Sequence, residues 1–172
     1  MAKRVSLVLI LGLILIFLGC NEFSQPPSPQ DADAFLNTNR QDMDIIADFL
    51  IHIDTEHDLV FIDKDKTTVF FEFKQNDILS EDAKDALKRL RHAGCGSISL
   101  HKRDNTISFM IWSRTRGSVD CNIARTLDGE GLPVVQFQTE CIPISDGWYY
   151  CYADYEAYRI NPSKYNEMWI AQ

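Results

Sequence analysis

A histidine and a cysteine lie close together in the segment His92-Ala93-Gly94-Cys95. A thiol nucleophile needs an imidazole base beside it, so this spacing is compatible with a cysteine-dependent enzyme. The alternative is a histidine that interacts with the dipole at a helix end, next to a structural cysteine. We favour this alternative because no third group that would orient the imidazole accompanies the pair, and no other catalytic or cofactor-binding motif occurs. We therefore assign no catalytic residue and expect no cofactor, with a cysteine enzyme as the minor hypothesis.

Four cysteines in the second half of the chain are candidates for disulfide bonds: Cys95, Cys121, Cys141 and Cys151. A hairpin over 119–142 centred on Gly131 would place Cys121 opposite Cys141, and the apolar residues of both strands would then share a face. Elimination leaves Cys95 with Cys151. Four reduced, buried cysteines are the alternative. Because the chain has no Cys-x-x-Cys motif and no His or Cys cluster with ligand spacing, we expect no zinc site.

Two pairs of aspartates, Asp31-x-Asp33 and Asp63-x-Asp65, have the spacing that begins a calcium loop. An EF-hand loop also needs glycine at its sixth position and glutamate at its twelfth. Neither pair is followed by both residues. We therefore interpret the pairs as a solvated helix cap and a turn, and we expect no metal site.

Two further groups of residues are candidates for ligand binding. Arg114 and Arg116 form a short basic loop in an acidic protein and could hold a phosphate or a carboxylate, although a solvated loop is the favoured interpretation. In the aromatic run 148–152, strand alternation places Trp148, Tyr150 and Tyr152 on one face. Exposed aromatic rings in a row would suit a sugar or a peptide. One face of this strand must be core, and we expect the C-terminal segment to cover the other.

The N-terminus has the pattern of an export signal. Lys3 and Arg4 precede an almost uninterrupted apolar run from Val5 to Leu18. At 1.5 Å per residue the run spans about 21 Å, less than the hydrocarbon core of roughly 30 Å. A charged start and a short apolar region are typical of a signal peptide. An uncleaved signal anchor is the alternative.

The apolar run ends in Phe17-Leu18-Gly19-Cys20. This segment resembles the lipobox of bacterial lipoprotein precursors, with Phe17 and Leu18 departing from the commonest residues of that motif. The resemblance implies that Gly19 is the last residue removed, and that Cys20 receives a diacylglyceryl group and becomes the new N-terminus. It covers residues 1–20 alone, and the rest of the chain resembles no family that we recognise.

A polar segment with three prolines, NEFSQPPSPQ over 21–30, follows Cys20 and is expected to be an extended spacer. The domain boundaries predicted on this basis are 1–19 for the signal peptide, 20–33 for the lipidated cysteine and spacer, and 34–172 for one globular domain. The expected location is the cell membrane or the outer membrane, reached through the N-terminal lipid. The net charge of −8 argues against nucleic acid as a partner.

The first part of the globular region contains two helix–hairpin patterns. A Thr-x-x-Gln capping box at Thr38 and apolar residues at three- and four-residue steps predict a helix over about 39–53. Strands over 58–62 and 67–73 follow. Ser80 and Gly94 delimit a second helix. Strands over 97–102 and 106–112 come next, so the pattern recurs after about 38–41 residues with few identical residues.

The last third of the chain is predicted to be mostly strand. Strands over 119–126 and 134–142 are joined by the turn region 128–133, and a strand over 148–152 follows the Asp146-Gly147 turn. The final segment, 155–172, is ambiguous between irregular structure and one short helix. The sum is an α+β domain with two helices packed on a mostly antiparallel sheet of about seven strands built from hairpins.

These observations indicate an exported envelope protein, anchored by a lipid, that acts as a binding or assembly module with a protein or glycan partner. An alternative is an inhibitor or immunity-type lipoprotein, in which an acidic domain caps a basic partner.

Overall fold

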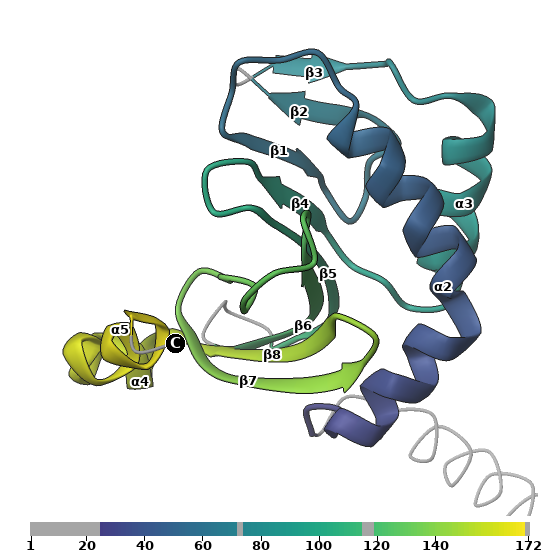
Figure 1. The fold of residues 1–172 in the computed structure, drawn as a ribbon. Helices are drawn as coiled ribbons and strands as arrows, with labels where there is room; N and C mark the ends of the chain where they lie inside the picture. The colour runs from purple at the N-terminus through teal and green to yellow at the C-terminus, as the bar shows by residue number, and fades with distance from the viewer. Residues whose placement is uncertain (1–24, 72–73, 115–118, 171–172) are drawn as a thin grey trace, which may run out of the picture.

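The computed structural model describes residues 25–71, 74–114 and 119–170 (Figure 1). Within these ranges the chain has four helices and eight strands, where two helices and about seven strands were predicted. In chain order they are α2 (Pro29–Ile51), β1 (Leu59–Ile62), β2 (Val69–Phe71), β3 (Lys74–Asn76), α3 (Glu81–His92), β4 (Ile98–His101), β5 (Thr106–Ser113), β6 (Val119–Thr126), β7 (Gln138–Ser145), β8 (Trp148–Asp154), α4 (Tyr155–Ile160) and α5 (Pro162–Ile170). Arg116 and the predicted signal peptide with Cys20 lie outside the described residues.

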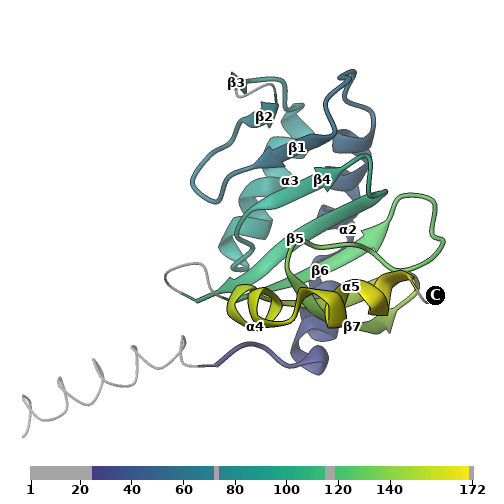
Figure 2. The ribbon, with the colours of Figure 1, turned by 90° about the vertical axis from the view of Figure 1, so that its left-hand side faces the viewer.

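The strands form one open sheet in the order β3-β2-β1-β4-β5-β6-β8-β7, with every neighbouring pair antiparallel. Helices α2 and α3 pack side by side on one face of this sheet, whereas α4 and α5 lie on the other side, beside β7 and β8 (Figures 1 and 2). The α+β class and the antiparallel sheet are therefore as predicted. The core between sheet and helices contains, among others, Leu36, Met43, Ile46, Leu87, Leu90, Ile98, Leu100, Ile107, Phe109 and Trp148.

Helix α2 begins ten residues before the predicted start near residue 39, so the predicted capping box at Thr38 is wrong. Ser28 is the N-cap: its Oγ accepts a hydrogen bond from the backbone N–H of Asp31, and the Asp31 carboxylate accepts one from the backbone N–H of Ser28. Thr38 lies inside the helix, where its hydroxyl donates to the carbonyl of Ala34. Residues 29–33, assigned above to the spacer, are thus helical.

The two predicted helix–hairpin patterns are present as two similar units. Ser80 caps α3 by accepting from the Ala83 N–H, and Gly94 ends the helix with a φ of 101°. Both hairpins, β1–β2 and β4–β5, form as predicted. Strands β1 and β4 are antiparallel neighbours at the middle of the six-strand run β3-β2-β1-β4-β5-β6. On one side of this middle the strands follow in the chain order β1, β2, β3, and on the other side in the chain order β4, β5, β6. The recurrence in the sequence therefore corresponds to a repeated arrangement in the fold.

The predicted hairpin over 119–142 is wrong, because β8 lies between β6 and β7. A two-residue turn at Asp146 and Gly147, with φ of 32° and 77°, joins β7 to β8 as the adjacent pair. Residues 127–137 cross over to place β8 beside β6. Cys121 accordingly lies opposite Tyr152, and Cys141 lies opposite Cys151. The register that favoured a Cys121–Cys141 bond does not exist, and all four cysteines of the described chain are free thiols.

The C-terminal segment, which the sequence left ambiguous between irregular structure and one short helix, forms both α4 and α5. Asp154 ends β8 and caps α4 by accepting a hydrogen bond from the Ala157 N–H. The side chains of Tyr155 and Tyr158 pack edge-on against Phe137, with ring centroids 4.9 and 5.6 Å apart. These contacts fix the loop before β7 on the side of the sheet away from α2 and α3.

Candidate functional site

The sheet face away from α2 and α3 carries polar residues along its central strands. In β4, Ile98 and Leu100 are buried on the helix side, so Ser99 and His101 point to the other side. The same alternation in β5 and β6 places Ser108 and Asn122 on this open face. The open face is therefore built by the same strands that supply the core.

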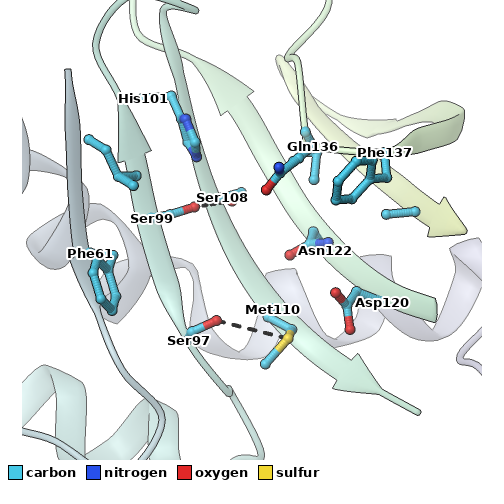
Figure 3. Close-up of a pocket in the computed structure, with 13 residues that line it drawn as sticks. Phe61, Ser97, Ser99, His101, Ser108, Met110, Asp120, Asn122, Gln136 and Phe137 are labelled. Carbon is cyan, nitrogen blue, oxygen red and sulfur yellow. Dashed lines mark hydrogen bonds between the residues drawn. The ribbon is translucent and has the colours of Figure 1, made fainter. Parts of the chain in front are cut away.

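A groove with a volume of about 410 Å³ lies on this open face (Figure 3). Its floor is formed by β4, β5, β6 and β8, with β1 on one side and the segment 135–137 on the other. The lining residues are Leu59, Phe61, Ser97, Ser99, His101, Ser108, Met110, Asp120, Asn122, Val135, Gln136, Phe137 and Ala153. Among these described residues there is no lysine or arginine, so the groove does not suit an anion.

Asn122 is, with Ser108, one of the buried polar residues that line the groove. It is 7% exposed, and its amide makes no hydrogen bond to any described residue. Figure 3 shows this amide in the middle of the groove, between Ser108 and Asp120. Neither atom of the amide is among the fully buried atoms that lack a partner, so both remain accessible from the groove. An arrangement of this kind leaves a donor and an acceptor ready for a bound molecule.

The serines of the floor are partly engaged with each other. Ser99 Oγ and Ser108 Oγ are 2.8 Å apart across the β4–β5 pair. Ser97 Oγ donates to Met110 Sδ over 3.9 Å. A hydroxyl has one donor and two acceptor positions, so each serine of the Ser99–Ser108 pair retains capacity for a ligand.

Phe137 forms one wall of the groove and has an unusual backbone conformation. Its φ is 59°, a left-handed value that is rare for a bulky residue. The conformation is held by its carbonyl, which accepts a hydrogen bond from the Asp154 N–H at 3.1 Å, and by the packing of Tyr155 and Tyr158 on its ring. Strained residues of this kind concentrate at ligand-binding sites. Opposite it, Phe61 stacks on Phe70 with ring centroids 5.0 Å apart.

His101 lies at one end of the groove, and its side chain is 31% exposed. Burial lowers the pKa of His101, and the Asp104 carboxylate, 3.9 Å from Nδ1, opposes this shift only in part. The imidazole is therefore neutral at neutral pH, and it can both donate and accept a hydrogen bond.

The aromatic candidates from the sequence lie on the opposite face. Trp148 and Tyr150 are 2% and 4% exposed and belong to the core, and Tyr152 packs against that core. The Tyr150 hydroxyl donates to the carbonyl of Pro27, just before α2. The predicted alternation is confirmed, but these rings are not a ligand-binding surface, because they belong to or pack against the core on the face where α2 contacts β8.

The remaining sequence candidates do not assemble a site. Arg114 is exposed, and its backbone N–H bonds to the carbonyl of Val119. His92 is exposed, whereas Cys95 is buried, and burial raises the pKa of the Cys95 thiol to about 12. A thiol that stays protonated at neutral pH is a poor nucleophile.

The aspartate pairs also remain structural. Asp31 belongs to the capping box of α2, and the Asp63 carboxylate accepts a hydrogen bond from the Lys64 N–H within a turn. Within the described ranges, no three His, Cys, Asp or Glu residues are grouped so that they could hold a metal ion.

Comparison with known proteins gives no match for this chain: no family model, no curated protein and no solved structure is similar to it. None of the helices in the described part of the chain combines the length and the apolar character needed to span a bilayer. The groove on the open face is therefore the feature from which a function can be argued.

Proposed function

We propose that this chain is an exported envelope protein, held to a membrane by a lipid on Cys20, whose groove binds a neutral ligand rich in hydroxyl groups, such as an oligosaccharide. The single observation that carries the binding role is the Asn122 amide, which lies in the middle of the groove and makes no hydrogen bond to another described residue. Around it lie the hydroxyls of Ser99 and Ser108 and the carboxylate of Asp120. Hydroxyl, amide and carboxylate groups together satisfy the donors and acceptors of a sugar.

The walls of the groove also suit a sugar ring. Phe61 and Phe137 line the groove from different elements, and each ring is held by other aromatic side chains. The apolar face of a sugar packs well on an aromatic ring, while its hydroxyls reach the polar floor. A volume of about 410 Å³ is within the range of small-molecule sites.

An extended peptide is the less favoured ligand. Peptides that add a strand to a sheet need an edge with free backbone groups. The strands beneath the groove, β4, β5 and β6, are central and are paired on both sides. A peptide in the groove could therefore contact the side chains of these strands but could not pair with their backbone groups.

The proposed anchor is supported by the sequence. The charged start, the apolar run, the lipobox-like Gly19-Cys20 and the proline-containing segment after it agree with one another. Intact mass measurement of the protein purified from bacterial membranes tests this part. We expect a mass that begins at Cys20 with an added diacylglyceryl group, and a mass that begins at Met1 without lipid would contradict it.

The binding role is tested by titration calorimetry with neutral oligosaccharides of glucose and of N-acetylglucosamine, and with a panel of peptides. We expect an oligosaccharide to bind, and Asn122→Ala to weaken that binding by about 10- to 100-fold. Ser113→Ala is the matched control, because Ser113 is an exposed residue of the same sheet outside the groove. Binding of peptides alone, or oligosaccharide binding that Asn122→Ala leaves unchanged, would overturn the assignment.

A further inference from the structure

Two of the four free thiols in the described part of the chain lie against each other on the last strand pair of the sheet. Cys141 of β7 and Cys151 of β8 are directly opposite, within a stretch of regular register. Their Sγ atoms are 3.6 Å apart. Opposite residues in an antiparallel pair have Cα atoms about 4.5–5.5 Å apart, which is inside the range that a disulfide bond requires. The backbone is therefore already in place for a bond between them.

The two thiols differ in access to solvent. Cys151 is completely buried, whereas Cys141 is partly exposed. Burial and the neighbouring thiol of Cys141 both raise the pKa of Cys151. An external reagent therefore reaches Cys141 first, and Cys151 can react only with the sulfur beside it.

We propose that Cys141 and Cys151 form a redox pair that closes to a disulfide by exchange with a small disulfide such as oxidised glutathione. The Cys141 thiolate attacks one sulfur of glutathione disulfide, and the first glutathione leaves as a thiolate. Cys151, after losing its proton, then attacks Cys141 Sγ and displaces the second glutathione. Two protein thiols are oxidised, one glutathione disulfide is reduced, and the two protons pass to the glutathione thiolates.

The other two cysteines are placed where they cannot compete. Cys121 lies on the helix-covered face, with its Sγ 3.3 Å from the hydroxyl of Tyr150. Cys95 follows α3, and Arg91 binds its carbonyl oxygen at 3.1 Å. In the part of the chain that the structure describes, neither of them contacts a second thiol. The pairing is therefore specific to β7 and β8.

The proposed bond also lies next to the groove. Asn122 of β6 is opposite Cys151 of β8, which is opposite Cys141 of β7, so the three residues form a row across the open face. Strand β7 is the last strand of the sheet and has one neighbour only. Closing the disulfide fastens this edge strand to β8, and we expect it to raise the unfolding temperature by about 5 °C.

The experiment uses the full-length protein, equilibrated with reduced and oxidised glutathione in fixed ratios and then alkylated in denaturant. Under oxidising ratios we expect a loss of two hydrogens in the intact mass, with Cys95 and Cys121 fully alkylated. Cleavage at Asp146, which lies between the two cysteines, should give two peptides that remain joined until a reductant is added. This mapping uses the unmodified sequence and does not depend on any variant folding.

Variants provide the matched controls. Cys141→Ala and Cys151→Ala should each abolish the mass loss and the rise in unfolding temperature, whereas Cys121→Ala and Cys95→Ala should keep the mass loss. Alkylation of Cys95, Cys121, Cys141 and Cys151 at every glutathione ratio would overturn the proposal. A disulfide that includes Cys95 or Cys121 would overturn it as well.

Discussion

The two faces of the sheet are built by the same strands but differ in the kind of residue that they carry. On the face under α2 and α3, strand residues such as Leu100 and Phe109 are apolar and fully buried. One residue earlier on each strand, Ser99 and Ser108 point into the groove. Ser108 is 5% exposed and yet polar, so burial alone does not distinguish the faces. The difference teaches that the helix-covered face carries the stability, while the open face is available for recognition.

The largest effect should come from the covered face. Phe109 is fully buried, and its ring centroid is 5.9 Å from that of Trp148. Phe109→Ala removes a large core side chain and leaves a cavity, so we expect a loss of about 3–5 kcal/mol in the free energy of unfolding. Urea denaturation followed by circular dichroism measures it.

The neighbouring residue on the open face is the matched control. Ser108→Ala removes one hydrogen bond, to Ser99, and should cost about 1 kcal/mol or less. If Ser108→Ala destabilised the protein as much as Phe109→Ala, the distinction between a stabilising face and a recognition face would be wrong.

Arg125 is the charged exception on the covered face. Its Nη1 lies 3.2 Å from Asp44 Oδ1 of α2, and its guanidinium lies 4.8 Å from the centroid of the Trp148 ring. We expect Arg125→Ala to lower the free energy of unfolding by about 1–2 kcal/mol, because both the ion pair and the contact with the ring are lost. Arg159→Ala is the comparison, since its exposed pair with Glu156 should contribute very little. Equal effects of the two substitutions would show that the core environment of Arg125 is unimportant.

Two substitutions, one at the N-cap of α2 and one inside this helix, are expected to change the free energy of unfolding in different directions. Ser28→Ala removes the N-cap and should cost about 1 kcal/mol. Thr38→Ala replaces a residue inside the helix with a better helix former, so it should be neutral or slightly stabilising. Thermal unfolding of both variants measures this. The reverse result would place the helix start near residue 39, where the sequence pattern put it.

The sequence predicted the local elements better than their order. Both hairpins and α3 follow from alternation and from the residues Ser80 and Gly94, which are signals contained in a few neighbouring residues. The start of α2 was missed because Thr38 and Gln41 imitate a capping box, while the apolar positions Ala32 and Leu36 continue the helical spacing further back. The capping pattern and the apolar spacing indicate different helix starts, and only the packing of Ala32 and Leu36 in the core decides between them.

The position of β8 could not be predicted in the same way. Asp146-Gly147 was recognised as a turn, but a pattern of hairpins favours the sequential order β6-β7-β8, whereas the crossover by 127–137 places β8 next to β6. The disulfide prediction failed for this reason. The groove was missed for a related reason: its outward-facing residues Ser99 and Ser108 could be expected from alternation, but its wall at Phe137 depends on where the crossover lies.

The smallest expected effect distinguishes the two faces by their response to pH. Burial lowers the pKa of His101 in the folded protein below the value of 6.5 that an unfolded chain has. Between the two pKa values the unfolded chain binds a proton that the folded chain does not, so the free energy of unfolding falls as pH decreases below about 6.5. His101→Gln removes this proton uptake, and unfolding measured from pH 7.5 to 5.5 should then depend less steeply on pH. Phe109→Ala, on the covered face, lowers the stability but should leave the pH dependence as in the unmodified protein. An unchanged pH dependence in His101→Gln would contradict the burial of a neutral imidazole in the groove.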